Sequence, residues 1–376
     1  MNAVCILKNK NLHLQNQGVS RILRFENMIP GVKMILLLCV VCSGLFFSCS
    51  KDTTVTLVGN WVKGSDLDGV ARGDAASFSI GSKGYLCGGY DGKNRLNDLW
   101  EYDSSTKSWT QKAQLPVAGK DGATETAIAR NSATGFSIGS KGYIVNGYDG
   151  ETYLNDCWEY NPASNSWTKK APFGGTARYN AIGFGSSTSG YVGTGFDGKE
   201  QKDFYKFDPI ANSWTLFPGF MGAKRMGGFV FVIDNKAYVG GGINSGSGSY
   251  VDDFSELDMS NDTWVELRRL SSVSSETYDD DYAMIVRAYG VGFAINGKGY
   301  IATGQSTGGS TSQLVWEYEP STDLWTKKQA FEGNARTAAV GFSFGSSAFI
   351  TTGRSSTYRF DDLLEFRPME DYNSND

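Results

Sequence analysis

The sequence predicts an all-β fold built from six similar four-stranded antiparallel sheets. First, 47 glycines and 13% aromatic residues fit many short strands joined by tight turns. Second, "SFSIGSKGYLCGGYDGKNRLNDLWEY" at residues 77–102 returns as "GFSIGSKGYIVNGYDGETYLNDCWEY" at residues 135–160. Third, the shared pattern recurs along the chain in units of about 50 residues, the size of one propeller blade. The expected architecture is therefore a six-bladed β-propeller.

The N-terminal segment differs from the repeats. An apolar run, "MILLLCVVCSGLFFS", follows Lys33 and ends in a small residue before Cys49, which is the pattern of a secretory signal. A run of this length is short for a membrane-spanning helix. "LFFSCSKD" resembles the lipobox of Bacteroidota-type lipoproteins, which implies lipidation of Cys49. Plain secretion and an uncleaved anchor are the alternatives.

Removal of residues 1–48 changes the composition. They hold five of the 35 Lys and Arg residues, one of the 40 Asp and Glu residues, and His13, the only histidine. The remaining 30 basic and 39 acidic residues argue against non-specific nucleic-acid binding. Without histidine the commonest general base and metal ligand is missing, so we expect no metal and no cofactor. Cys87 and Cys157 occupy apolar positions of the repeat, and we expect two core thiols without a disulfide.

The repeat is clearest when counted from an arginine. The six starting arginines are Arg72, Arg130, Arg178, Arg225, Arg287 and Arg336. Phe follows each arginine after six residues, an aromatic residue after thirteen, and Gly after seventeen. A phrase such as "NDLWEYD" comes next, and a Trp follows it in the first five units. Each unit thus holds four short strands separated by turn residues.

The two ends of the repeat region complete each other. The sixth unit stops after "DDLLEFR" without a fourth strand, whereas "GNWVKGSD" near the start is a lone fourth-strand phrase containing Trp61. We expect this strand to pair with the last blade, because closure removes two exposed sheet edges. The predicted organisation is a leader and lipoprotein signal peptide at 1–48, a short tether at 49–58 and the propeller at 59–376.

The units resemble kelch repeats, on the glycine that ends the second strand, the aromatic residue of the third and the Trp of the fourth. The first and fourth units keep the doubled glycine of that pattern, whereas Asn146, Thr194, Thr303 and Thr352 replace its first glycine in the others. The resemblance covers nearly all of residues 59–376. It implies the kelch type of six-bladed propeller.

The six arginines precede the innermost strand of each blade and are expected near one mouth of the central channel. A bare ring of charges would cost on the order of 10 kcal/mol, so an anionic partner is required. One answer is internal ion pairs with the aspartates that open the third strands, namely Asp98, Asp156, Asp203, Asp253 and Asp362. In the fifth blade Leu314 stands at the aspartate position, which would leave Arg287 free for an anionic ligand. Matching arginines of several kelch proteins bind acidic ligands.

Variable loops are expected on the same face. Tyr90, Tyr148 and Phe196 could stack on sugars, with the aspartates that follow them either accepting hydroxyl hydrogen bonds or simply making turns. The longest inserted link is 271–286, whose acidic cluster could cap the arginine ring, bind a cation, act as a lid or simply be solvated.

Three classes of function stay open. The first is a lipid-anchored envelope protein of the outer membrane, periplasmic or surface-exposed, whose arginine-bearing face binds a carbohydrate, an acidic small molecule or a protein partner. The second is a mutarotase or isomerase of sialic acid-like sugars, although the loop Glu and Arg of that resemblance do not pair here by spacing. The third is a scaffold subunit of an outer-membrane complex. Galactose oxidase chemistry is rejected because its copper site needs histidines. We expect a monomer and no catalytic residues.

Overall fold

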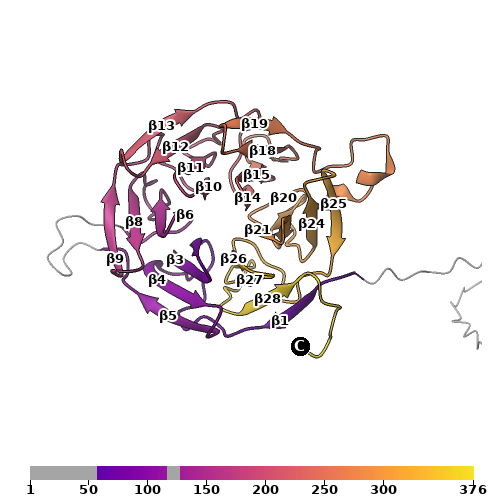
Figure 1. Cartoon of the computed structure of the whole chain (residues 1–376), viewed down its shortest axis with the longest axis horizontal. Helices are drawn as coiled ribbons and strands as arrows, with labels where there is room; N and C mark the ends of the chain where they lie inside the picture. The colour runs from indigo at the N-terminus through magenta and orange to yellow at the C-terminus, as the bar shows by residue number, and fades with distance from the viewer. Residues whose placement is uncertain (1–56, 117–127) are drawn as a thin grey trace, which may run out of the picture. The chain divides into compact units, whose positions relative to one another are not determined.

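A computed structural model describes residues 57–116 and 128–376 of the chain. They belong to the second of two compact units, Thr56–Asp376. Six four-stranded antiparallel sheets follow one another around a central axis (Figure 1). The predicted six-bladed propeller is therefore confirmed.

Each blade runs outward from the axis in chain order, apart from the last. Blades one to three are β2 (Ala76–Ile80), β3 (Lys83–Tyr90), β4 (Arg95–Asp103) and β5 (Ser108–Lys112); β6 (Thr134–Ile138), β7 (Lys141–Val145), β8 (Cys157–Asn161) and β9 (Ser166–Lys170); β10 (Ile182–Gly185), β11 (Gly190–Gly193), β12 (Phe204–Asp208) and β13 (Ser213–Phe217). Blades four to six are β14 (Phe229–Ile233), β15 (Lys236–Gly240), β18 (Phe254–Asp258) and β19 (Thr263–Glu266); β21 (Val291–Ile295), β22 (Lys298–Ala302), β24 (Val315–Glu319) and β25 (Leu324–Lys328); β26 (Val340–Phe344), β27 (Ser347–Thr351), β28 (Leu363–Arg367) and β1 (Asn60–Lys63).

The N-terminal strand closes the ring. Strand β1 pairs antiparallel with β28, with Trp61 opposite Phe366, and the two lie side by side in Figure 1. The Trp61 ring is buried and contacts the rings of Phe331 and Phe366 at centroid distances of 4.9 and 4.6 Å. Because the first described strand supplies the fourth strand of the last blade, the predicted closure is confirmed.

Neighbouring blades interlock through the repeated Phe and Gly. Phe78 of the first strand stacks on Tyr85 of the second at 4.9 Å, and the same pairing recurs as Phe136 with Tyr143 at 5.3 Å. A Cβ placed on Gly142 would lie 2.1 Å from the Phe78 ring of the preceding blade. The glycine of "SKGY" therefore leaves the space into which the aromatic ring of the previous blade packs.

The glycine that ends each second strand is needed for its backbone conformation. At the six positions φ lies between 90° and 112°, a region that favours glycine. The residue before it is also left-handed, with φ from 58° to 65°, including Thr194, Thr303 and Thr352. The structure thus accounts for the doubled glycine of the pattern, and it places threonine where a β-branched residue is strained.

The link between blades four and five contains two 3₁₀ turns, η1 (Thr277–Asp279) and η2 (Tyr282–Met284). Asp279 is buried and accepts hydrogen bonds from the backbone N–H groups of Val273 and Ser274. Two short two-stranded sheets lie in neighbouring loops. They are β16 (Ile243–Asn244) with β17 (Ser249–Tyr250), and β20 (Arg287–Ala288) with β23 (Gln305–Ser306). One acid of the predicted acidic cluster thus organises the link itself.

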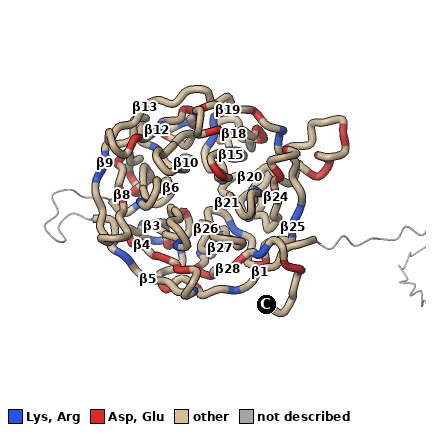
Figure 2. The backbone as a smooth tube through the Cα atoms, viewed as in Figure 1, with Lys and Arg blue, Asp and Glu red and all other residues tan. Residues whose placement is uncertain are grey.

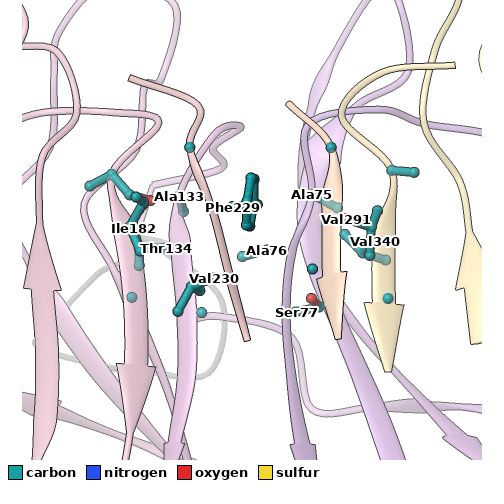
Figure 3. Close-up of a pocket in the computed structure, with 18 residues that line it drawn as sticks. Ala75, Ala76, Ser77, Ala133, Thr134, Ile182, Phe229, Val230, Val291 and Val340 are labelled. Carbon is teal, nitrogen blue, oxygen red and sulfur yellow. The ribbon is translucent and has the colours of Figure 1, made fainter. Parts of the chain in front are cut away.

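The central channel is small and uncharged. The innermost strands β2, β6, β10, β14, β21 and β26 contain no Lys, Arg, Asp or Glu and are tan in Figure 2. The channel has a volume of about 200 Å³, and three residues of each blade line it, among them Ala76, Ile182, Phe229 and Val340 (Figure 3). The residues that line it therefore offer a ligand no charged side chain.

Candidate functional site

Five of the six repeat arginines are buried and form ion pairs with partly exposed aspartates of their own blade. Arg72 donates to both carboxylate oxygens of Asp98 at 2.5 and 2.8 Å, and Arg130 donates to Asp156 at 2.5 and 2.7 Å. The other pairs are Arg178 with Asp203, Arg225 with Asp253, and Arg336 with Asp362. The predicted internal ion pairs are thus confirmed. Each also ties the start of the first strand to the start of the third.

Arg287 is held differently. It donates to the carbonyls of Ile285, Thr303, Leu314 and Met284 at 2.7–3.0 Å, and its side chain is fully buried. Burial lowers its pKa to about 9. The bonds to Ile285 and Thr303 have counterparts at the other five arginines, such as Val70 and Gly88 for Arg72. The structure differs from the expectation that Arg287 is free, because the carbonyls of Leu314 and Met284 take the place of the carboxylate. The six guanidinium groups lie in the protein interior, and their ligand-binding role stays a prediction.

A closed ring of six backbone hydrogen bonds surrounds the channel mouth at the arginine end. Each N–H donates to the carbonyl of the equivalent residue in the neighbouring blade at 2.7–3.0 Å. In order of donation the ring is Asp74, Ala338, Tyr289, Gly227, Asn180, Ser132 and again Asp74. All six residues have φ between 52° and 62°. The cavity that they line at the mouth holds about 160 Å³.

Three side chains place ionisable groups at the channel mouth. Asp74 accepts a hydrogen bond from Nε of Arg354 at 2.7 Å. The Tyr289 ring lies over Gly227, where a Cβ would be 2.4 Å from a ring carbon. Burial raises the pKa of Tyr289, so its hydroxyl stays protonated at neutral pH. The mouth therefore presents a carboxylate, a guanidinium and a phenol.

Outside the mouth, guanidinium groups alternate with aromatic rings over blades six, one and two. The Tyr90 ring lies 5.5 Å from the guanidinium carbon of Arg359 and 5.2 Å from that of Arg95. Arg95 also lies 4.8 Å from the ring of Tyr148. Such distances are those of cation–π contacts. We call Arg359, Tyr90, Arg95 and Tyr148 the ladder.

The ladder continues into blade three as an aromatic cluster. Tyr148, Tyr153, Tyr179 and Phe196 have ring centroids 5.3–6.1 Å apart. Tyr90, Tyr148 and Phe196, which the sequence suggested for sugar stacking, are thus brought into one partly exposed surface. Whether they bind a ligand stays a prediction.

The aspartates of these loops make turns. Asp91 accepts hydrogen bonds from the backbone N–H groups of Lys93 and Asn94, and Asp149 accepts them from Glu151 and Thr152. The turn interpretation of these two residues is confirmed.

Two larger pockets are described in blades five and six. The blade-five pocket holds about 530 Å³ and is lined by Met284, Ser306, Thr307, Thr311, Ser312, Gln313, Leu314 and Ala330. The blade-six pocket holds about 490 Å³ and is lined by Asn334, Ala335, Ser355, Tyr358, Arg359 and Phe360. The second pocket therefore meets the ladder at Arg359.

Sequence reasoning missed Arg95, Arg359, Tyr153, Tyr179 and the mouth residues. A signal was present in the repeat for some of them. Two residues after each arginine comes a member of the hydrogen-bonded ring, such as Asp74 or Tyr289. Eighteen residues after it comes a loop position: Tyr90, Tyr148, Phe196, Ile243, Gln305 and Arg354. Twenty-three residues after Arg72, Arg130 and Arg336 come Arg95, Tyr153 and Arg359, so the repeat carried a signal for these residues too.

Other predicted features fall in different places. Cys87 and Cys157 are buried free thiols, as expected. Cys49 and most of the tether lie outside the described residues. Within 57–116 and 128–376, no group of three or more His, Cys, Asp or Glu side chains is placed to hold a metal ion. The same part of the chain has no helix long and apolar enough to cross a membrane.

Known proteins resemble the chain in its repeats. The family model of the KLHDC2/KLHL20/DRC7 kelch-repeats domain matches residues 62–226. Human Kelch-like protein 4 is 34% identical over 80 residues, which cover 21% of this chain and 10% of that protein. N-acetylneuraminate epimerase of Yersinia enterocolitica is 27% identical over 152 residues, covering 31% of this chain and 38% of the epimerase. The chain thus matches well under half of the length of these curated relatives.

The fold extends further than the sequence similarity. The solved structure of YjhT superposes with a TM-score of 0.63 at 18% identity and covers 80% of this chain and 95% of that one. This likeness shows the fold alone. The chain is therefore a six-bladed β-propeller, and its residues 62–226 are similar to a kelch-repeat family.

Proposed function

We propose that the loop face at the arginine end of the propeller binds an acidic carbohydrate along the ladder. The observation that carries this proposal is that the Arg95 guanidinium is held between two tyrosine rings but has few hydrogen-bond partners. Its guanidinium lies against the rings of Tyr90 and Tyr148, while its only hydrogen bond in the described part of the chain goes from Nε to Asn131 at 2.9 Å. The terminal nitrogens are left for an external acceptor.

The chemistry of the ladder fits such a ligand. Guanidinium groups donate paired hydrogen bonds to carboxylates, and these charge-assisted bonds are among the strongest in proteins. Tyrosine rings offer flat apolar faces to the C–H faces of sugar rings, together with hydroxyls for sugar hydroxyls. Arg95 and Arg359 have no carboxylate within ion-pair distance among residues 57–116 and 128–376. The arginines of the repeat, by contrast, are already satisfied.

The test is a glycan array with the purified full-length chain, followed by calorimetry on the glycans that bind. Arg95→Gln should weaken binding of an acidic glycan about tenfold or more, since one charge-assisted contact contributes about 1.5–3 kcal/mol. The matched control is Arg268→Gln, because Arg268 also lies over a tyrosine, Tyr278 at 4.9 Å, in the link region. Equal binding of acidic and neutral glycans would contradict the proposal. Absence of glycan binding would favour the third class of function, a scaffold subunit whose ligand is another protein.

A second candidate is interconversion of sugar anomers. Partial similarity to N-acetylneuraminate epimerase supports it, and so does the mouth, where Asp74, Tyr289 and Arg354 converge. Ring opening of a sugar needs a proton donor and an acceptor within reach of the anomeric hydroxyl and the ring oxygen. A phenol and a carboxylate supply these groups. Exchange of N-acetylneuraminate anomers, followed by NMR, should be accelerated by the protein and not by Tyr289→Phe.

We further propose that the propeller is displayed on the cell envelope by a lipid on Cys49. Support comes from the apolar run and the "SCSKD" phrase that follows it. Mass spectrometry of the mature N-terminal peptide tests this, because a lipidated Cys49 adds acyl chains and Cys49→Ala should release the protein from the membrane fraction. An unmodified cysteine in the mature protein would contradict it.

A further inference from the structure

The sizes of the cavities indicate which of them could enclose a whole sugar ring and not only contact one edge of it. Sites for small molecules measure about 300–1,000 Å³. The channel, at about 200 Å³, and its mouth, at about 160 Å³, are smaller than this range. The pockets of blades five and six, at about 530 and 490 Å³, lie within it.

Charge distinguishes these two pockets. The residues that line the blade-five pocket include no Lys, Arg, Asp or Glu. Arg287 reaches two of its lining residues, but its guanidinium is used by the backbone carbonyls of Met284 and Leu314. The blade-six pocket includes Arg359. An anionic group therefore has a charge partner in the blade-six pocket.

The Arg359 guanidinium is positioned by packing and lacks acceptors. It lies over the Tyr90 ring at 5.5 Å, and its Nε is buried without a hydrogen-bond partner. No hydrogen bond or ion pair joins its side chain to residues 57–116 or 128–376. Neighbouring Arg354, in contrast, is paired with Asp74. The terminal nitrogens of Arg359 are not among the buried unpaired atoms, so they, and not Nε, can meet an acceptor from outside the chain.

The other walls of the pocket suit a sugar ring. Tyr358 is 69% exposed, so one face of its ring is open to a ligand. Ser355 Oγ accepts a hydrogen bond from the Tyr358 N–H at 3.1 Å, which leaves the hydroxyl proton to donate. The Phe360 ring is packed at 4.1 Å by the Arg336 guanidinium, which fixes the floor.

We propose that the blade-six pocket is the subsite for the carboxylate-bearing terminal sugar of an acidic glycan, with the carboxylate on Arg359 and the ring against Tyr358. This inference rests on the proposed function and adds the position and chemical class of the terminal residue. The next sugar lies over Tyr90, toward Arg95. The pocket receives the end of the glycan because the loop of blade five, "QSTGGSTS", has no aromatic or cationic residue to continue the ladder.

The experiment measures binding of sialyllactose and digalacturonate, each compared with its methyl ester, to the full-length chain by calorimetry. The ester keeps the shape of the sugar and removes its charge. For whichever acid binds, the wild-type protein should prefer the acid about tenfold or more, and Arg359→Gln should reduce that preference to near unity. Arg359→Lys should keep part of it. Thr307→Ala, in the blade-five pocket, is the matched control and should change nothing.

The outcomes separate the two proposals. If Arg95→Gln weakens binding while Arg359→Gln leaves the preference for acid over ester intact, the subsite is overturned and the binding face stands. If the wild-type chain binds neither acid more tightly than its ester, both proposals are overturned. Thermal unfolding checks each variant, and Arg359→Gln should lower the melting temperature only slightly, because its side chain gives up the contact with the Tyr90 ring but no protein hydrogen bond among the described residues.

Discussion

Blade five differs from the other five blades in the groups that accept hydrogen bonds from its buried arginine. In blades one to four and six the buried arginine meets a partly exposed carboxylate, so that its charge is neutralised. In blade five Leu314 stands at the aspartate position and Arg287 meets four carbonyls. The difference teaches that the arginine serves first as a tie between strand ends, and that backbone acceptors can replace the carboxylate.

The largest effect should come from removing a carboxylate in an ordinary blade. Asp156→Ala leaves the Arg130 guanidinium buried without its counter-charge and should lower the free energy of unfolding by about 3 kcal/mol. Urea unfolding measures it. Asp280→Ala, in the exposed part of the link, is the control and should cost less than about 0.5 kcal/mol. A loss below about 1 kcal/mol for Asp156→Ala would mean that carbonyls alone hold these arginines.

The next prediction tests whether blade five is unusual only at the arginine. Glu101 of blade one accepts from Tyr85 at 2.6 Å, and Glu317 of blade five accepts from Tyr300 at 2.6 Å. Substituting either glutamate with alanine leaves a buried phenol unpaired and should cost about 2 kcal/mol. Chemical denaturation of both variants should give equal losses. A clearly smaller loss for Glu317→Ala would mean that blade five differs throughout.

Restoring the aspartate in blade five should have a smaller effect. Leu314→Asp offers Arg287 a carboxylate, but its donors already have acceptors, so the free energy of unfolding should change by less than about 1 kcal/mol. The reciprocal Asp362→Leu in blade six should cost about 3 kcal/mol. Comparison of the two unfolding midpoints is the measurement. Strong stabilisation by Leu314→Asp would show that the carbonyl arrangement is a poor replacement.

The smallest effect should appear at low pH. Burial alone would raise the pKa of Asp156, but hydrogen bonds and charge from Arg130 lower it overall. A lowered pKa stabilises the fold above the unfolded value of about 3.9, and this contribution is lost as pH falls through the still lower folded value. Wild-type stability should therefore fall by up to about 1 kcal/mol more than that of Asp156→Ala between pH 5 and about pH 3. If the free energy of unfolding depended on pH with the same slope in both proteins, the lowered pKa of Asp156 would be contradicted.

Much of the architecture could be predicted because the repeat keeps its register in each blade. Phe78 and Tyr85, at fixed distances from Arg72, fall on paired strands and stack. The ladder was only half predictable. Tyr90 and Tyr148 lie 18 residues after a repeat arginine, and Arg95 and Arg359 lie 23 residues after one. Counting within one unit does not show, however, that Arg95 reaches the Tyr148 ring of the next blade or that Arg359 reaches Tyr90.

The sequence by itself determined the number of blades, their four strands, the closing strand with Trp61 and the five aspartate partners. These features depend on short-range spacing and alternation, which a chain carries within each unit. Only the tertiary structure decided that Arg287 is satisfied by carbonyls and that Arg359 borders a pocket without a hydrogen-bond partner in the described chain. Contacts between loops of neighbouring blades depend on how the ring closes, and the spacing of residues within one repeat does not determine that geometry.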